Sequence, residues 1–130
     1  DMKAISSVDG YSAVVIGAPI YTGKVSPEAA FFARRFRDSL GRIPVAGFVT
    51  GIAPVYPKTG DISGFTRQLE GALDPVRPVA VTIFAGKLDP EKLSWFQRWV
   101  VKKANSPVGD FRDWAAIAAW ARGLPEKMKV

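Results

Sequence analysis

Three apolar stretches predict the strands of one sheet. Residues 12–18, 45–50 and 79–85 are apolar at nearly every position, and the last two end at Gly51 and Gly86. Strands that are apolar on both faces are typical of parallel sheets covered by helices on both sides. We therefore expect a buried parallel sheet.

The segments between and after these strands have helical spacing. Phe32, Phe36 and Leu40 recur every four residues and predict one helix from Ser26 to Leu40 with a buried stripe. Further helices are predicted from residue 61 or 63 to 73, over 91–104 and over 114–122, the last one capped by Asp113 and closed by Gly123 and Pro125. This alternation predicts an α/β domain with parallel strands.

The composition narrows the chemistry. The 130 residues are 48% hydrophobic, which is enough for one domain with a core. Cysteine and histidine are both absent, so thiolate chemistry, disulfides and the commonest general base and metal ligand are excluded. The net charge of +6 suits an anionic ligand, a nucleic acid or an acidic membrane surface. Because cysteine and histidine are absent, any reaction must depend on a cofactor or on carboxylates.

Four stretches occur in an order that resembles a known family. They are Tyr11-Ser-Ala-Val-Val-Ile-Gly-Ala-Pro-Ile-Tyr-Thr-Gly23, Phe48-Val-Thr-Gly51, Phe84-Ala-Gly-Lys-Leu-Asp-Pro-Glu-Lys-Leu93 and Gly109-Asp-Phe-Arg-Asp-Trp114, with Trp120 in the helix that follows. The chain resembles flavodoxin-domain proteins of the menaquinone-dependent protoporphyrinogen IX dehydrogenase (oxidase) type. The resemblance implies a flavodoxin-like three-layer sandwich, FMN at the carboxyl ends of the strands, and electron transfer. In some members of the family the electrons pass from protoporphyrinogen to a quinone, within heme biosynthesis.

The resemblance assigns a flavin-facing role to two loops. Tyr21 would stack on the flavin ring, while Pro19, Ile20, Thr22 and Gly23 would mostly offer backbone groups. The matching loop after the second strand consists of Thr50, Gly51, Ile52 and Ala53. The alternatives are a loop tyrosine packed on the next helix and a plain strand-to-helix turn. Lys24 and Lys58 could neutralise an anionic flavin or a porphyrin propionate, although surface lysines usually do neither.

One part of the flavodoxin pattern has no counterpart before Tyr11. Flavodoxins begin with a strand and a Ser/Thr-rich loop that holds the FMN phosphate at a helix N-terminus, and such a unit takes about 30 residues. We therefore expect a single, N-terminally incomplete domain over residues 1–130. It should hold little or no FMN by itself, whereas a longer parent would bind FMN.

A missing first strand also has a consequence for assembly. The edge of the strand at residues 13–18 would be unpaired, and such edges attract other chains. We expect one of three outcomes: two copies pair as a homo-oligomer, an excised amino-terminal piece stays bound at the edge, or residues 1–10 fold back over it.

The helix predicted over 91–104 carries tryptophans among cations. Leu93, Phe96, Val100 and Ala104 form its expected core stripe. Trp95 and Trp99 lie elsewhere on the helix, on the side of Lys92, Arg98, Lys102 and Lys103. This pattern suits a membrane interface or the border of a quinone or porphyrin pocket; alternatively, a neighbouring loop covers both indoles. The sequence contains no nucleic-acid recognition motif.

The sequence favours an FMN-dependent oxidoreductase that passes electrons to a quinone. An electron-carrier flavodoxin is a second hypothesis, although such carriers are expected to be acidic. A flavin-free structural or interaction module is the third. Asp110 and Asp113 are predicted to serve loop and cap structure, so no side chain is predicted to be catalytic, and no metal-ligand spacing is present. Without an apolar run of about 18 residues or a signal peptide, we expect a cytoplasmic protein, with peripheral contact at the inner face of the cell membrane left open.

Overall fold

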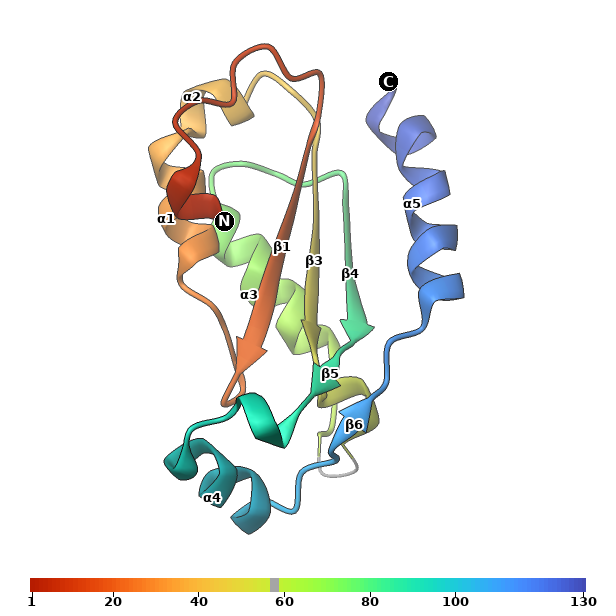
Figure 1. The fold of residues 1–130 in the computed structure, drawn as a ribbon. Coiled ribbons are helices and arrows are strands. Elements are labelled where there is room, and N and C mark those ends of the chain that lie inside the picture. Colours follow the sequence, from red (N-terminus) through yellow and green to blue (C-terminus); the bar gives the residue numbers. More distant parts are fainter. Residues whose placement is uncertain (57–58) are drawn as a thin grey trace.

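The computed structural model describes residues 1–56 and 59–130, and its main feature is a sheet between two helical layers (Figure 1). Strands β1 (Val14–Tyr21), β3 (Val45–Gly51) and β4 (Ala80–Ala85) are parallel. Strand β2 (Lys24–Val25) runs antiparallel to the end of β1, and the order is β2-β1-β3-β4. The predicted α/β three-layer class is confirmed, but β1 extends to Tyr21 rather than ending at residue 18.

Helices α1 (Glu28–Arg35), α2 (Arg37–Leu40) and α3 (Ser63–Leu73) form the layer on one side. The prediction of one continuous helix from Ser26 to Leu40 is wrong, because the backbone leaves the helical region at Phe36, with φ −112° and ψ 20°. The buried stripe is confirmed: Phe32 and Leu40 belong to the core, and Phe36 packs against it. Ser26 does not cap the backbone; its hydroxyl donates to the Glu28 carboxylate at 2.7 Å.

Helix α5 (Trp114–Met128) covers the other side of the sheet along β3 and β4. Trp120 packs edge-on against Phe48 and Phe84, with ring centroids 6.2 and 5.6 Å away. The predicted end at Arg122 is wrong, because the helix continues through Gly123 and Pro125 and buries Leu124 and Met128 against Ala46. No helix among the described residues is both long and apolar enough to cross a bilayer.

Strand β1 differs from β3 in how well it is covered. Val45 and Ala46 on β3 are both fully buried, as expected for a strand covered on two faces. On β1, Ile16 is buried, but Val15 on the opposite face is 46% exposed, since α5 packs mainly along β3 and β4. The expectation of cover on both faces therefore holds for β3 and is wrong for β1. Among the described residues, no strand pairs with residues 14–18 at the outer edge of β1.

Short elements gather at the carboxyl ends of the strands (Figure 1). They are η2 (Ala53–Val55), β5 (Lys87–Leu88), η3 (Pro90–Lys92), α4 (Trp95–Lys103) and β6 (Gly109–Asp110); η1 (Met2–Ala4) lies beside α1. The prediction of one helix over 91–104 is wrong at its start, because η3 ends at Lys92 and α4 begins only after Ser94. The Ser94 hydroxyl accepts from the Gln97 N–H while the Gln97 side chain accepts from the Ser94 N–H, which fixes the start of α4.

Candidate functional site

The parallel register brings the two predicted flavin-facing segments together. Pro19 on β1 lies opposite Thr50 on β3, and Thr50 lies opposite Phe84 on β4. One position further along, a Cβ placed on Gly51 would be 3.1 Å from the Cβ of Ile20. Residues 19–20 and 50–51 therefore form one contiguous edge, at the end of the sheet where ligands of open α/β folds bind.

Tyr21 ends β1 in a tight hairpin rather than in an open loop. Thr22 and Gly23 form its two-residue turn, both with positive φ (48° and 79°), and Tyr21 pairs with Lys24. Positive φ at both positions matches the right-handed twist of hairpin strands. The Gln68 side chain from α3 holds the hairpin, since it accepts from the Val25 N–H at 3.0 Å. The expectation that residues 19–23 are a loop is thus corrected, and Tyr21 is left 67% exposed.

Several backbone groups at this edge are already bonded within the protein. The Pro19 carbonyl accepts from the Ser26 N–H at 2.9 Å, and the Gly51 carbonyl accepts from the Gly86 N–H at 2.8 Å. A Cβ on Gly86 would be 3.1 Å from the Thr50 hydroxyl oxygen and 3.3 Å from the Gly51 nitrogen, so a larger residue there would press on the end of β3. The sequence identified Gly86 only as the end of a strand. A ligand at this edge would therefore meet side-chain surface, above all the Tyr21 ring, more than the carbonyls of these residues.

The loop after β3 is partly buried, although the sequence predicted that its residues face a flavin. Ile52 is half-buried, and Ala53 is buried in the first turn of η2. Ala53 therefore supports the loop and does not present its side chain to solvent. Lys24 lies exposed in the hairpin, whereas Lys58 lies outside the described residues.

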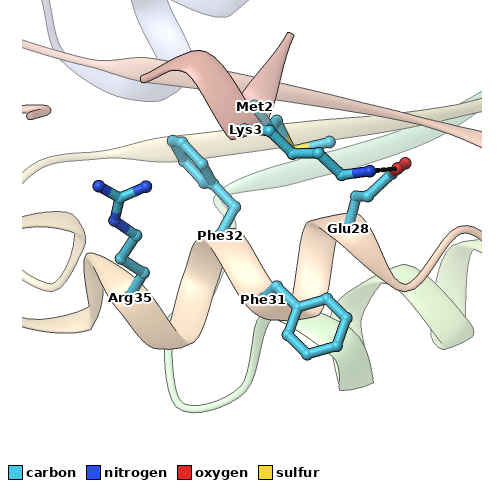
Figure 2. A pocket seen from close by; sticks show the side chains of 6 residues that line it. All are labelled: Met2, Lys3, Glu28, Phe31, Phe32 and Arg35. Carbon is cyan, nitrogen blue, oxygen red and sulfur yellow. Dashed lines mark ion pairs between the residues drawn. The ribbon is translucent and has the colours of Figure 1, made fainter. Parts of the chain in front are cut away.

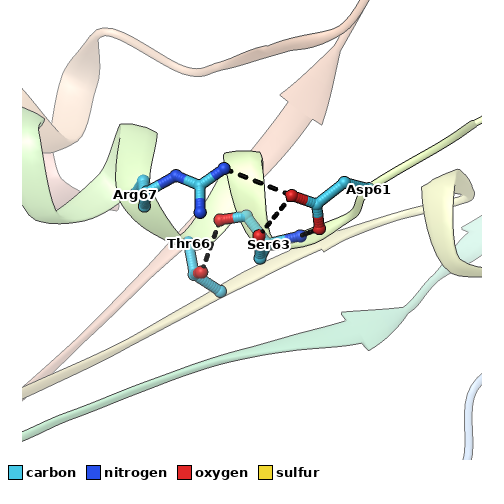
Figure 3. A network of polar contacts seen from close by, with 4 residues as sticks. All are labelled: Asp61, Ser63, Thr66 and Arg67. Atoms are coloured by element: carbon cyan, nitrogen blue, oxygen red, sulfur yellow. Dashed lines mark hydrogen bonds and ion pairs between the residues drawn. The ribbon is translucent and has the colours of Figure 1, made fainter.

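The N-terminus of α3 is the helix start that follows this loop, and it already holds an anion (Figure 3). The Asp61 carboxylate accepts from the Ser63 N–H at 2.9 Å and from the Ser63 hydroxyl at 2.7 Å, and Arg67 lies 3.2 Å away. These hydrogen bonds, with the Ser63 hydroxyl first, lower the pKa of Asp61. A helix N-terminus can bind phosphate through its amides, but here a carboxylate of the chain occupies that position.

Two motif stretches quoted for the family resemblance pair with each other. Lys87 and Leu88 in β5 lie opposite Asp110 and Gly109 in β6, and the Phe111 N–H donates to the Gly86 carbonyl at 3.0 Å. This pairing connects both stretches to the edge formed by β3 and β4. The interpretation of Asp110 and Asp113 as residues that stabilise a loop and a helix cap is confirmed. The Asp113 carboxylate accepts from the Ala116 N–H at 3.0 Å and caps α5, and the Asp110 carboxylate accepts hydrogen bonds from the Arg112 side chain.

Helix α4 presents an aromatic surface at the same end of the molecule. Trp95 is 81% exposed, Phe96 55% and Trp99 53%. The alternative that a loop covers both indoles is therefore wrong, and so is the assignment of Phe96 to a core stripe. The sequence did not reveal the role of Tyr56: its hydroxyl donates to the Ala104 carbonyl at 2.6 Å and ties α4 to the loop after β3.

The cavities described in the structure lie away from this edge. One of about 350 Å³ follows the outer edge of β1, where Val8, Tyr11 and Val15 are among its lining residues. The other, about 250 Å³, lies between η1 and α1 (Figure 2). There Lys3 pairs with Glu28 at 3.0 Å, and the Phe31 ring points away from the sheet. The first segment of the chain thus packs on α1 and leaves a groove beside β1.

These features define a class before they define a family. The described chain is an α/β domain with parallel central strands, helices on both faces of the sheet and an exposed aromatic at the carboxyl ends of the strands. In open α/β folds, ligands bind at this end of the sheet. Residues 1–114 match the family model described as Flavodoxin domain, and the chain therefore belongs to that family. Flavodoxin domains are FMN-binding electron-transfer domains. No curated protein and no solved structure matches the chain.

Proposed function

We propose that the edge formed by residues 19–21 and 50–51 contacts the ring of FMN, and that the chain belongs to an FMN-dependent oxidoreductase of the protoporphyrinogen dehydrogenase type with a quinone as acceptor. The observation that carries the proposal is the exposed Tyr21 beside the contiguous edge of β1 and β3. The finer assignment rests on the sequence resemblance and is supported by the pairing of two of its motif stretches in β5 and β6.

The described residues fit the ring better than the phosphate of FMN. Tyr21 offers a broad aromatic face, and Gly51 and Gly86 keep side chains out of the close contacts along the edge. By contrast, Asp61 occupies the N-terminus of α3, and its negative charge would repel a phosphate there. We therefore assign ring contact to this chain and no phosphate contact to the α3 N-terminus.

The chain's own residues would bind and orient the group. Tyr21 would cover one face of the ring, and the hairpin held by Gln68 would keep the Tyr21 backbone in place. The Thr50 hydroxyl lies at the same edge, where it would serve as a hydrogen-bonding group. When bound, FMN supplies the redox chemistry, and the protein supplies binding, orientation and electrostatics.

A titration with riboflavin and with FMN tests the ring site, because the two ligands differ only in the phosphate. We expect weak binding of both to the 130-residue chain, with dissociation constants that agree within about threefold, since a phosphate without partners adds little free energy. Tyr21→Ala should weaken the binding of both ligands by about 1–3 kcal/mol, which is the scale of one aromatic contact and its buried area. Flavin fluorescence quenching measures the dissociation constants.

Tyr11→Ala is the matched control, because Tyr11 is also an exposed tyrosine but precedes β1 at its opposite end. Its affinity for riboflavin should equal that of the unaltered chain. Equal losses of flavin affinity in Tyr21→Ala and Tyr11→Ala, or no flavin binding at millimolar concentrations, would contradict the ring site. For the substrate class, anaerobic protoporphyrinogen IX should bleach the visible absorbance of the flavin-loaded protein, and no bleaching would exclude this donor.

A flavin-free interaction module is the second candidate function. The observation in its favour is the intramolecular carboxylate at the N-terminus of α3. The same riboflavin titration separates it from the first candidate, since a flavin-free module binds neither ligand.

A further inference from the structure

We propose that helix α4 docks the protein on an anionic lipid bilayer, with Trp95, Phe96 and Trp99 at the headgroup level and Lys102 and Lys103 against the lipid charges. This inference goes beyond the proposed function and does not depend on flavin binding. It starts from three exposed aromatic side chains, Trp95, Phe96 and Trp99, which lie within five consecutive positions of α4.

The three aromatic rings form one continuous surface. At about 100° per residue, positions 95, 96 and 99 lie within an arc of about 100° on the helix. Phe96 stacks on Trp99 with centroids 6.1 Å apart, and Trp95 packs edge-on against Phe96 at 6.0 Å. No residue of α4 is buried. The aromatic surface therefore does not belong to the protein core, although exposing it to water costs free energy.

The charges on the helix suit an anionic surface. Lys102 and Lys103 occupy its last turn, Arg98 lies between the two tryptophans in sequence, and none of the nine residues of α4 is acidic. The Lys103 ammonium group lies 5.8 Å from the Trp99 ring centroid, so cation and aromatic surface are contiguous. Indoles prefer the bilayer interface, and each nearby cation adds attraction to anionic headgroups.

The helix is held in place before it docks. Ser94 and Gln97 cap its start, Arg98 donates to the Leu93 carbonyl at 3.1 Å, and Tyr56 holds the Ala104 carbonyl at its end. Binding to a surface therefore loses less conformational entropy than it would for an unfolded segment. The helix is about 13 Å long and lies at the end of the molecule, where a flat surface can reach it (Figure 1).

Vesicle co-sedimentation of the 130-residue chain tests the proposal. We expect binding to phosphatidylcholine vesicles that contain phosphatidylglycerol, little binding to phosphatidylcholine alone, and release by added salt, because screening acts over about 8–10 Å at physiological ionic strength. Lys102→Glu with Lys103→Glu should lower the partition coefficient at least about tenfold. Trp95→Ala with Trp99→Ala should lower it by a similar factor, about tenfold, through lost interfacial contact.

The matched control is Arg34→Glu with Arg35→Glu on α1. This pair changes the net charge by the same amount and also lies next to an exposed aromatic, with Arg34 4.9 Å from the Phe31 ring centroid. It should change partition less than about threefold if α4 is the docking element. An equal loss in the two charge variants would show attraction by net charge alone and would overturn the proposal. An unchanged partition in the tryptophan variant, or no binding to any vesicle, as expected for a protein partner at α4, would overturn it too.

Discussion

At the scale of single residues, Gly17 shows how closely β1 and β3 fit on the face toward α5. A Cβ placed on Gly17 would clash with the tip of the Phe48 ring. That half-buried ring packs against Phe84 and Trp120, with centroids 5.8 and 6.2 Å away. A side chain at position 17 would therefore displace a ring that belongs to an aromatic cluster.

Gly17→Ala should lower the free energy of unfolding by about 1–3 kcal/mol, because overpacking displaces the aromatic cluster. Urea denaturation followed by circular dichroism measures this change. Gly71→Ala is the matched control: it lies exposed in α3 with open space around a new Cβ, and it should stabilise the protein by about 0.5–1 kcal/mol. Equal effects of the two substitutions would contradict the contact with Phe48.

Asp110 allows a test of one ion pair. Hydrogen bonds from the Arg112 side chain, followed by the Arg112 N–H, lower the pKa of Asp110 from 3.8 to about 2. A pKa lowered in the folded state stabilises the fold above pH 3.8, and the contribution is lost as the pH falls through about 2. Because the pair is solvated, its effect on the titration should be easier to measure than its effect on stability.

Arg112→Gln should raise the pKa of Asp110 toward 3.8, as seen by carboxyl-carbon NMR across an acid titration. Asp9 serves as the internal control, since Ser39 and Ser7 lower its pKa first and Arg112 does not contribute. A pKa of Asp110 that stays near 2 in the variant would show that another group lowers it.

At the scale of elements, α5 depends on tertiary contacts at its end. Gly123 and Pro125 disfavour a helix locally. Leu124 and Met128, however, bury their side chains against β3, and Pro125 lies on the exposed side, where water can reach the carbonyl that it leaves unbonded. Burial of two large apolar side chains is worth about 1.5–3 kcal/mol each, which offsets the local cost.

Gly123→Ala should therefore stabilise the protein by about 0.5–1 kcal/mol, since Gly123 is helical with no atom within 4 Å of a new Cβ. Leu124→Ala should cost about 2–5 kcal/mol. Thermal unfolding of both variants checks the pair of values. If α5 instead ended at Arg122, with Gly123 in a left-handed turn, Gly123→Ala would destabilise the protein. Leu124→Ala would then cost little stability.

At the scale of the whole molecule, the outer edge of β1 has no strand partner along residues 14–18 among the described residues. The Val14 N–H donates to the Pro44 carbonyl, and successive amides of a strand point to opposite sides. The N–H groups of Val15 and Gly17 therefore point to the unpaired edge, along a groove of about 350 Å³. Residues before β1 pack on α1 and the core through Met2 and Val8, and they make no backbone hydrogen bonds to this edge among the described residues.

We expect the 130-residue chain to associate through this edge as its concentration rises, which multi-angle light scattering would detect. Val15→Lys should suppress association, because an edge lysine disfavours strand pairing. Val79→Lys is the control, since Val79 is similarly exposed but precedes β4 at the opposite side of the sheet. A strictly monomeric chain, or equal suppression by the two lysines, would contradict association at β1.

The sequence by itself determined the sheet and the order of its elements. The apolar runs at 12–18, 45–50 and 79–85 predicted the strands because local burial patterns follow the period of each element. The motifs also predicted a flavodoxin domain. Both features depend on residues close to one another in the chain.

Tertiary structure alone decided which faces are covered. Helical periodicity placed Phe96 on an apolar stripe but could not show whether another element packs against it, and the structure leaves it 55% exposed. Leu124 and Met128 extend α5 past two helix breakers because β3 lies beside them. Val15 is exposed because α5 lies mainly over β3 and β4. Burial arises from contacts between distant segments, so a local pattern predicts an element's type but not its neighbours.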